Sequence, residues 1–175
     1  MRQFATNPPA EFKISDKLEA RQFVQTDAQM LLELALDEAV SRFVPWAKYI
    51  TTIESASWQI ANFSETREDN TFNRYAVVLD GSSVGYIGCW PDDKEGFYEF
   101  GFAILPKTRG IGIGKAAVMS LMDILKTECE ALGIVAYVND DNEASKTVVT
   151  KLGFTPLDEI NENERRYELS LSNVE

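Results

Sequence analysis

The amino-acid sequence predicts a three-layer α/β (α+β) sandwich, in which helices cover both faces of a mixed, mostly antiparallel central sheet. Three observations support this fold class. The chain has 175 residues and 45% hydrophobic content, enough to bury one sizeable core. Alternating apolar patterns predict two hairpins in the first two thirds of the chain and another at its end. Between them a strand, a glycine-rich loop, an amphipathic helix and a further strand form a crossover.

The beginning of the chain is predicted to be a flexible arm over residues 1–10, and residues 11–175 are predicted to form a single domain. Apolar residues alternate over 12–14 and again over 18–24, with a polar turn between them. This pattern is typical of a hairpin.

Two helices are expected next. The first is capped by Thr26 or Asp27 and carries apolar residues on one face. The second runs over residues 52–65, and its predicted inward residues are Ile53, Ala56, Ile60 and Phe63. Between the two helices, Pro45 interrupts the helical pattern.

A second hairpin is predicted from residues 75–79 and 84–90, because Asp80-Gly81 supplies the positive φ angles of a tight turn. The strand over residues 97–105 follows it. After the glycine loop, an amphipathic helix is expected to end at Gly133 as its C-cap.

The last third of the chain is predicted to contain a short apolar strand over 134–138 and a helix that begins at Asn142 and stops at Gly153. Two further strands, 154–157 and 165–171, are expected to pair across a polar turn.

Charge and cysteine content narrow the function classes. The formal charge is −11 and the pI is near 4.5, which argues against a nucleic-acid or anionic-membrane surface and favours a cationic or amine-bearing partner. Cys89 and Cys129 are too few for a disulfide framework or a zinc site. Without a signal-like or membrane-spanning segment, the expected location is the cytoplasm. A homodimer remains open.

The stretch from Arg109 to Lys115 is the most informative in the chain. Gly110, Gly112 and Gly114 alternate where a helix is expected to begin, so several backbone N–H groups can point at an anion with no Cβ in the way. The two bracketing cations add to the field of the helix dipole. The loop therefore predicts a phosphate-binding site.

Two general phosphate motifs fit this loop less well. A P-loop would need glycine where Arg109 stands and serine or threonine where Ala116 stands. Residues 112–117 fit the dinucleotide pattern G-x-G-x-x-A, and Asp140 and Asp141 follow the next strand. Because four residues separate the strand from the glycines and one crossover is visible, a nicotinamide-dinucleotide enzyme is the weaker alternative.

Residues 109–114 match the Arg/Gln-x-x-Gly-x-Gly/Ala signature of the GCN5-related N-acetyltransferases (GNAT). Residues 142–145 (Asn-Glu-Ala-Ser) and 151–154 (Lys-Leu-Gly-Phe) resemble the Asn-x-x-Ser helix and Leu-Gly-Phe turn of the Rim-type ribosomal-protein N-terminal acetyltransferases. The resemblance extends over residues 12–171. It implies the GNAT fold.

The resemblance also implies acetyl-coenzyme A (acetyl-CoA) as the acetyl donor. It implies that the loop amides bind the pyrophosphate, that the backbone of the preceding strand end pairs with the pantetheine arm, and that Asn142 is a cofactor ligand and helix cap. No metal site is expected. The predicted cofactor-binding residues are Ala103, Ile104, Leu105, Arg109, Gly110, Ile111, Gly112, Ile113, Gly114, Lys115 and Asn142.

Acetyl transfer in this family implies direct attack of a neutral amine on the thioester. An amide near residues 102–104 is the expected oxyanion donor. Many family members protonate the leaving thiolate with a tyrosine, but Val149 occupies that position here. Ser145 is the predicted substitute, as in the Rim-type branch; the alternative is a helix-surface serine.

The chain contains no histidine, so another group must deprotonate the amine. By strand alternation Glu99 shares a face with Gly101 and Ala103, where it can hold a water near the amine. The alternative is a solvent-facing glutamate. Tyr137 is a second candidate base, because some N-terminal acetyltransferases place a glutamate there.

The expected function is therefore acetyl-CoA-dependent acetylation of a primary amine, on a peptide or protein N-terminus or on a small molecule. Because the usual tyrosine and histidine are missing, an acyl-CoA-binding module without turnover is the alternative. Trp46, Tyr49, Trp58 and Trp90 are candidates for the acceptor pocket, with core packing as the alternative for each.

Overall fold

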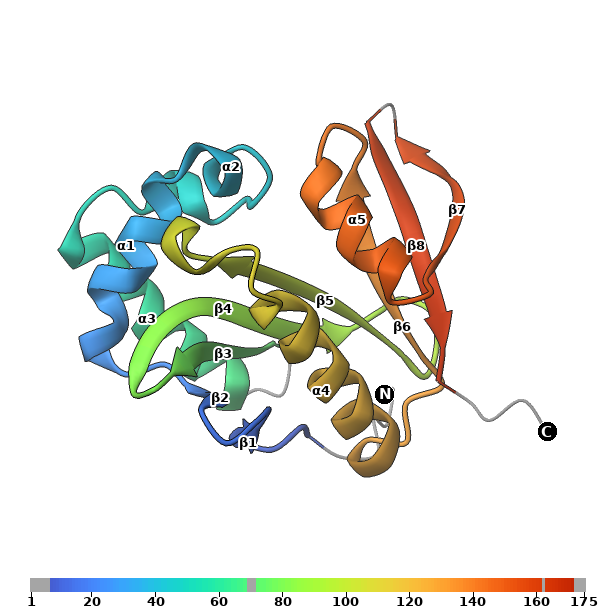
Figure 1. Cartoon of the computed structure of the whole chain (residues 1–175), viewed down its shortest axis with the longest axis horizontal. Helices are drawn as coiled ribbons and strands as arrows, with labels where there is room; N and C mark the ends of the chain where they lie inside the picture. Colours follow the sequence, from blue (N-terminus) through green and yellow to red (C-terminus); the bar gives the residue numbers. More distant parts are fainter. Residues whose placement is uncertain (1–6, 69–71, 162, 172–175) are drawn as a thin grey trace.

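The computed structural model describes residues 7–68, 72–161 and 163–171. It contains one sheet of eight strands in the order β1-β2-β3-β4-β5-β6-β8-β7, with helices on both faces (Figure 1). Neighbouring strands of the described sheet are antiparallel, apart from the parallel pair β5 and β6. The predicted fold class is confirmed.

The strands are β1 (Glu11–Lys13), β2 (Leu18–Gln22), β3 (Asn73–Leu79), β4 (Ser82–Pro91), β5 (Phe97–Ile104), β6 (Gly133–Asn139), β7 (Thr155–Asn161) and β8 (Glu164–Ser170). The α-helices are α1 (Ala28–Leu36), α2 (Glu38–Ser41), α3 (Ile53–Glu68), α4 (Ile113–Glu128) and α5 (Glu143–Lys151). Short 3-10 turns lie at Gln25–Asp27, Ala47–Tyr49 and Pro106–Thr108. The order of the elements agrees with the prediction, apart from the additional helix α2.

Each face of the sheet has its own hydrophobic core. On one face Leu31 of α1 and Ile60 of α3 pack with Tyr86 of β4. On the other face Leu121 of α4 packs with Ile87 of β4. Because side chains alternate along a strand, the two cores draw on alternate residues of the same strands.

The predicted turn at Asp80-Gly81 is confirmed, with φ angles of 48° and 79°. The predicted C-cap of the long helix is wrong: α4 ends at Glu128, and Gly133 is the first residue of β6. Glycine is needed there for another reason, since a Cβ would lie 2.0 Å from the ring of Phe97.

Two further expectations need correction. Ile53 was expected to face inward, but it is 40% exposed at the first turn of α3. The last hairpin has longer strands than predicted, because Asn161 of β7 still pairs with Glu164 of β8. The polar side chains there did not prevent strand pairing at the edge of the sheet.

The described part of the predicted N-terminal arm contacts the sheet. The Tyr75 hydroxyl donates to the Pro9 carbonyl at 2.9 Å, and the Gln22 N–H donates to the Ala10 carbonyl at 3.1 Å. Residues 1–6 lie outside the described residues.

The sheet divides between β5 and β6, which creates the setting for the site. The two strands pair only where Phe97–Glu99 meets Gly133–Val135. Beyond Glu99, β5 stays paired with β4, while β6 stays paired with β8. Figure 1 shows β5 and β6 diverging, with α5 on the side of β6 and β8. Glu99 therefore stands at the point where the sheet opens.

Candidate active site

A first cavity, of about 560 Å³, lies where the end of β5, the glycine loop, the start of α4 and the start of α5 meet. Its lining includes Phe102 and Ser145 together with most of the predicted cofactor-binding residues. These are Ala103, Ile104, Arg109, Gly110, Gly112, Ile113, Gly114, Lys115 and Asn142. The fold thus brings together residues from β5, the glycine loop, α4 and α5.

The loop conformation depends on two glycines. Gly110 and Gly112 have φ angles of 79° and 87°, in the left-handed region, and Gly112 is the N-cap of α4. A Cβ at either position would meet no atom within 4 Å, so conformation and not space requires glycine. The first N–H groups of α4 have no intrahelical acceptor and lie at the cavity. This donor set, with the helix dipole behind it, fits phosphate groups.

Gly114 has a different role. A Cβ at this position would lie 2.9 Å from the Phe102 ring, so glycine lets α4 pack closely against β5. This close approach places the start of the helix beside the strand end that lines the same cavity.

The Arg109 side chain supports the loop. Its Nε donates to the Ile104 carbonyl at 2.8 Å, and its Nη2 donates to Asp37 Oδ1 at 2.8 Å. These bonds tie the loop to β5 and to the junction of α1 and α2. The guanidinium thus stabilises the loop and also places a positive charge beside the cavity. The sequence did not suggest the stabilising role. Lys115 lines the cavity as well.

Two predicted cofactor-binding residues do not line this cavity. The Leu105 N–H donates to the Val84 carbonyl at 2.8 Å, so this amide extends the pairing with β4 and is not available to a ligand. Its side chain is buried in the core. Ile111 is 68% exposed. Strand pairing thus uses the Leu105 amide, and the loop turns the Ile111 side chain outward.

A second cavity, of about 520 Å³, adjoins the first and shares Phe102, Asn142 and Ser145 with it. The lining is rich in aromatic side chains. It includes Phe43, Trp46, Tyr49, Tyr86, Trp90, Phe100, Phe102 and Tyr137. Three of the four aromatic residues considered for an acceptor pocket are therefore present, whereas Trp58 is 67% exposed on α3.

The three predicted catalytic residues, Glu99, Ser145 and Tyr137, all line the second cavity. Burial is the main reason that the pKa of the Glu99 carboxyl is raised to about 7. A hydrogen bond from the Trp90 side chain opposes this shift, while the nearby charge of Asp92 adds to it. Glu99 is thus a carboxyl that titrates near neutral pH.

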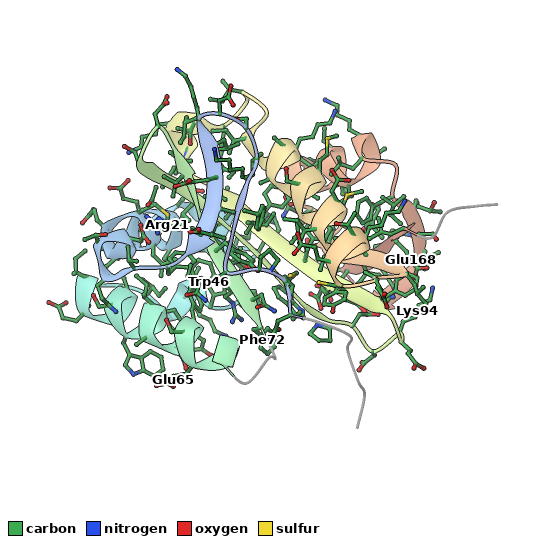
Figure 2. All side chains as sticks on the ribbon, turned by 90° about the horizontal axis from the view of Figure 1, so that it is seen from below. Arg21, Trp46, Glu65, Phe72, Lys94 and Glu168 are labelled. Atoms are coloured by element: carbon green, nitrogen blue, oxygen red, sulfur yellow. The ribbon has the colours of Figure 1, made fainter. Side chains whose placement is uncertain are left out.

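Tyr137 belongs to a partly buried polar network. Its hydroxyl donates to Asp92 Oδ2 at 3.0 Å and accepts from Arg166 Nη1. Arg166 also binds Asp92 Oδ1 at 2.8 Å and Glu168, which pairs in turn with Lys94 (Figure 2). The pKa of Tyr137 is raised by burial and by the bond to Asp92. This hydroxyl is better suited to positioning than to accepting a proton.

The network was missed in the sequence. Asp92 lies just after β4 and Arg166 lies in β8, so 74 residues separate them in the chain. Burial by itself raises the pKa of the Asp92 carboxyl, but hydrogen bonds from Arg166, the Lys94 backbone and Tyr137, together with the Arg166 charge, hold it below its usual range. No local pattern marks either residue, because an acid after a strand and an arginine within one are common on surfaces.

Asn142 and Ser145 lie at the start of α5, where the two cavities meet. The Asn142 Oδ1 accepts from the Ser145 N–H at 3.1 Å, which confirms the predicted helix cap. Val149, one turn later, is 1% exposed and also lines the second cavity.

The family model described as Acetyltransferase (GNAT) domain matches residues 17–155, which is most of the chain. The protein therefore belongs to the GNAT family of acetyltransferases, and the family prediction is confirmed. A comparison with curated protein sequences gave no match.

Solved structures of acetyltransferases share the fold. RimL, a ribosomal L7/L12 α-N-protein acetyltransferase in complex with coenzyme A, has a TM-score of 0.81 at 16% identity, covering 91% of this chain and 97% of that one. The microcin C7 self-immunity acetyltransferase MccE, in complex with acetyl-CoA and AMP, has a TM-score of 0.80 at 15% identity, covering 93% and 97%. Mycobacterium smegmatis RimJ, in complex with CoA-disulfide, has a TM-score of 0.75 at 18% identity, covering 87% and 81%.

Rim-type enzymes are thus among the structures with this fold, as the resemblance implied. In the described residues, no helix combines the length and the hydropathy needed to cross a membrane.

Proposed function

We propose that this acetyltransferase moves the acetyl group of acetyl-CoA directly to a primary amine, on a peptide or protein N-terminus or on a small molecule. One observation carries the proposal: a phosphate-binding helix start and a carboxyl with a pKa of about 7 lie in two cavities that meet at Ser145. RimL and MccE, which share the fold, were solved with coenzyme A and acetyl-CoA, respectively.

The first cavity would hold the donor. The amides from Gly110 to Lys115 would bind the pyrophosphate, and the helix dipole would favour its charge. In the described sheet, β5 has no pairing with β6 beyond Glu99, so its edge at Ala103 and Ile104 is suited to pair with an extended pantetheine arm. An amide of this strand end is the proposed oxyanion donor.

The second cavity would hold the acceptor amine next to Glu99. When bound, acetyl-CoA supplies the activated thioester. At neutral pH a group with a pKa of about 7 is substantially ionised, so Glu99 can accept the ammonium proton, directly or through a water. The N–C bond then forms as the C–S bond breaks. Ser145, which lines both cavities, is placed to donate its hydroxyl proton to the departing sulfur while it takes up the second proton of the attacking nitrogen.

Thermal unfolding and thiol release test this proposal. Acetyl-CoA in about 100-fold excess over its Kd is expected to stabilise the fold by about 2.7 kcal/mol. A panel of amino acids, peptides and polyamines is expected to release free thiol with at least one amine. No shift with any acyl-CoA, or a shift with NAD(P) alone, would contradict donor binding. A shift without thiol release for any amine would show a binding module without turnover.

A further inference from the structure

Aromatic rings make up much of the lining of the second cavity. They come from the segment 43–49, from β4, from β5 and from β6, so rings face the cavity from several sides. The apolar side chains of Val138 and Val149 add to this lining. Walls of this kind stabilise an apolar part of a ligand by removing it from water, and they offer a polar part few hydrogen-bond partners.

The rings on the β4 side adjoin the proposed proton acceptor. Trp46 packs edge-on against Tyr86, with the ring centroids 5.4 Å apart. A Cβ on Gly101 would lie 3.3 Å from Trp90 Cη2 and 3.3 Å from the Tyr86 hydroxyl oxygen, so both side chains extend over this glycine. Trp90 pairs with Glu99 across β4 and β5, and its side chain donates a hydrogen bond to the Glu99 carboxyl. An ammonium group held at Glu99 would therefore have its carbon skeleton beside aromatic rings.

The formal charges of the described lining balance. Lys48 and Arg74 are cationic, whereas Glu99 and Glu164 are carboxylates. Because these residues give no excess of negative charge, the cavity gives an acceptor with several ammonium groups no advantage over one with a single ammonium group. The rings, and not the charges, are thus the feature that can select among amines.

Tyr49 lies at the open side of this cavity. It ends the 3-10 turn Ala47–Tyr49 and is 67% exposed, yet it belongs to the lining. The Lys48 Nζ lies over one part of the ring, 4.9 Å from its centroid. An exposed ring that lines a cavity still has apolar surface to bury when a ligand binds, whereas Tyr86, at 3% exposed, has little.

We propose that the acceptor is a monoamine with an aromatic or branched apolar group near the nitrogen, and that Tyr49 is a specificity-determining residue that packs against this group. The ammonium group binds at Glu99, and the apolar group lies among the rings. A small amine and the first residue of a peptide can both carry such a group. This inference rests on the proposed acetyl transfer and names its substrate class.

Amino-acid amides test the inference without altering the protein, because they share one α-ammonium group and differ in the side chain. Thiol release from acetyl-CoA is compared among glycinamide, leucinamide, phenylalaninamide and lysinamide, with spermidine as a polyamine. The better of the two apolar amides is expected to have a kcat/KM about 10- to 100-fold above that of glycinamide, the range for burial of one apolar side chain. Equal values, or a preference for lysinamide or spermidine, would overturn the inference and leave acetyl transfer standing.

The source of the apolar group is separated by three amines that carry the same ring: 2-phenylethylamine, phenylalaninamide and the amide of phenylalanyl-glycyl-glycine. A higher kcat/KM for the tripeptide amide would assign the group to a peptide N-terminus, and a higher value for 2-phenylethylamine would assign it to a small amine. Equal values would show that the cavity recognises the ring whichever molecule carries it. Values at or below that of glycinamide for all three would overturn the aromatic preference.

A Tyr49→Ala variant locates the effect. It is expected to lower kcat/KM for the best apolar amide about 3- to 30-fold, to leave glycinamide within about twofold, and to keep the thermal shift with acetyl-CoA. Tyr49→Phe keeps the ring and should keep the preference. Trp58→Ala is the matched control, because Trp58 is also 67% exposed but lies on α3 outside both cavities. Equal losses for both amides in Tyr49→Ala, or the same values as in Trp58→Ala, would contradict the role of Tyr49.

Discussion

The two cavities that meet at Asn142 and Ser145 are built in different ways. The first depends on backbone groups from one continuous loop, residues 109–115, and on the positive φ angles of two glycines within it. The second depends on side chains from β3, β4, β5, β6, β8 and the segment around Trp46. Backbone amides, as in the first cavity, suit a cofactor phosphate that many enzymes bind. In the second cavity, a single side-chain substitution can change which substrate is bound.

Substitutions in the two cavities are expected to act in different ways. In the first cavity a substitution acts by changing where amides point. In the second it acts by removing a proton acceptor, a proton donor or a charge. We therefore expect variants in the first cavity to change acetyl-CoA binding, and variants in the second cavity to change the rate of acetyl transfer.

The largest effect is expected from Glu99→Gln. Loss of the base should reduce kcat/KM for the amine by a factor of about 100 to 10,000. Acetyl-CoA should still raise the melting temperature by the same amount, because Glu99 lines only the second of the two cavities. A rate close to that of the wild-type protein would remove Glu99 from the mechanism.

The same variant has a stability signature. The pKa of Glu99 is raised from 4.5 to about 7 on folding, so the unfolded chain binds fewer protons in this window and wild-type stability falls as pH rises through it. Glu99→Gln should therefore melt at a higher temperature than the wild type at pH 8, with a smaller gain at pH 5. A gain that does not depend on pH would contradict the raised pKa.

Ser145→Ala is expected to lower kcat by a factor of about 10 to 100, because water can partly replace the hydroxyl as proton donor. The cap of α5 should survive, since Asn142 Oδ1 bonds to the backbone N–H of Ser145 and not to its hydroxyl. Thr150→Ala, on the same helix but exposed and outside both cavities, is the control. Equal rates for the two variants would assign Ser145 to the helix surface.

Gly112→Ala tests the backbone site. The left-handed φ of 87° should cost about 1–2 kcal/mol of stability and tilt the helix-start amides, weakening acetyl-CoA binding about tenfold in a titration. Gly81→Ala is a close control, because Gly81 has a φ of 79° and equally open space but lies in the β3–β4 hairpin. Both variants should lose similar stability, and only Gly112→Ala should lose affinity. Equal affinities would contradict the phosphate-binding role.

The smallest effect is expected from Asp92→Asn. The negative charge of Asp92 raises the pKa of Glu99, so its removal should lower that pKa. Arg166, no longer paired with this charge, should lower the pKa of Glu99 further. The acidic limb of the kcat/KM profile should move down by up to about one pH unit. The profile is measured well below the melting temperature, because loss of the buried ion pair also lowers stability. Asp93→Asn, an exposed neighbour, should leave the limb unchanged; an equal shift would point to a general charge effect.

Much of the fold could be read along the chain. The hairpin turn at Asp80-Gly81, the Asn142 cap and the apolar face of α4 depend on residues a few positions apart, and all were predicted. The errors came where distant residues decide. Gly133 follows an amphipathic helix and was therefore predicted to be its C-cap. The structure needs glycine there because the ring of Phe97 lies against it.

In the candidate site, too, local features could be predicted from the sequence and long-range ones could not. Glu99 was placed in the cleft by strand alternation, but its pKa of about 7 comes from burial that only the assembled sheet provides. The partly buried network around Asp92 and Arg166 had no signal in the sequence.

By itself, the sequence determined the family and the glycine loop at the start of α4, because backbone conformation at the start of a helix depends on a few adjacent residues. The tertiary structure decided which side chains share the second cavity, and with them the electrostatics around Glu99. The physical reason is that burial and Coulomb interactions depend on distances in space, and the sheet brings together groups such as Asp92 and Arg166, which the chain separates by 74 residues.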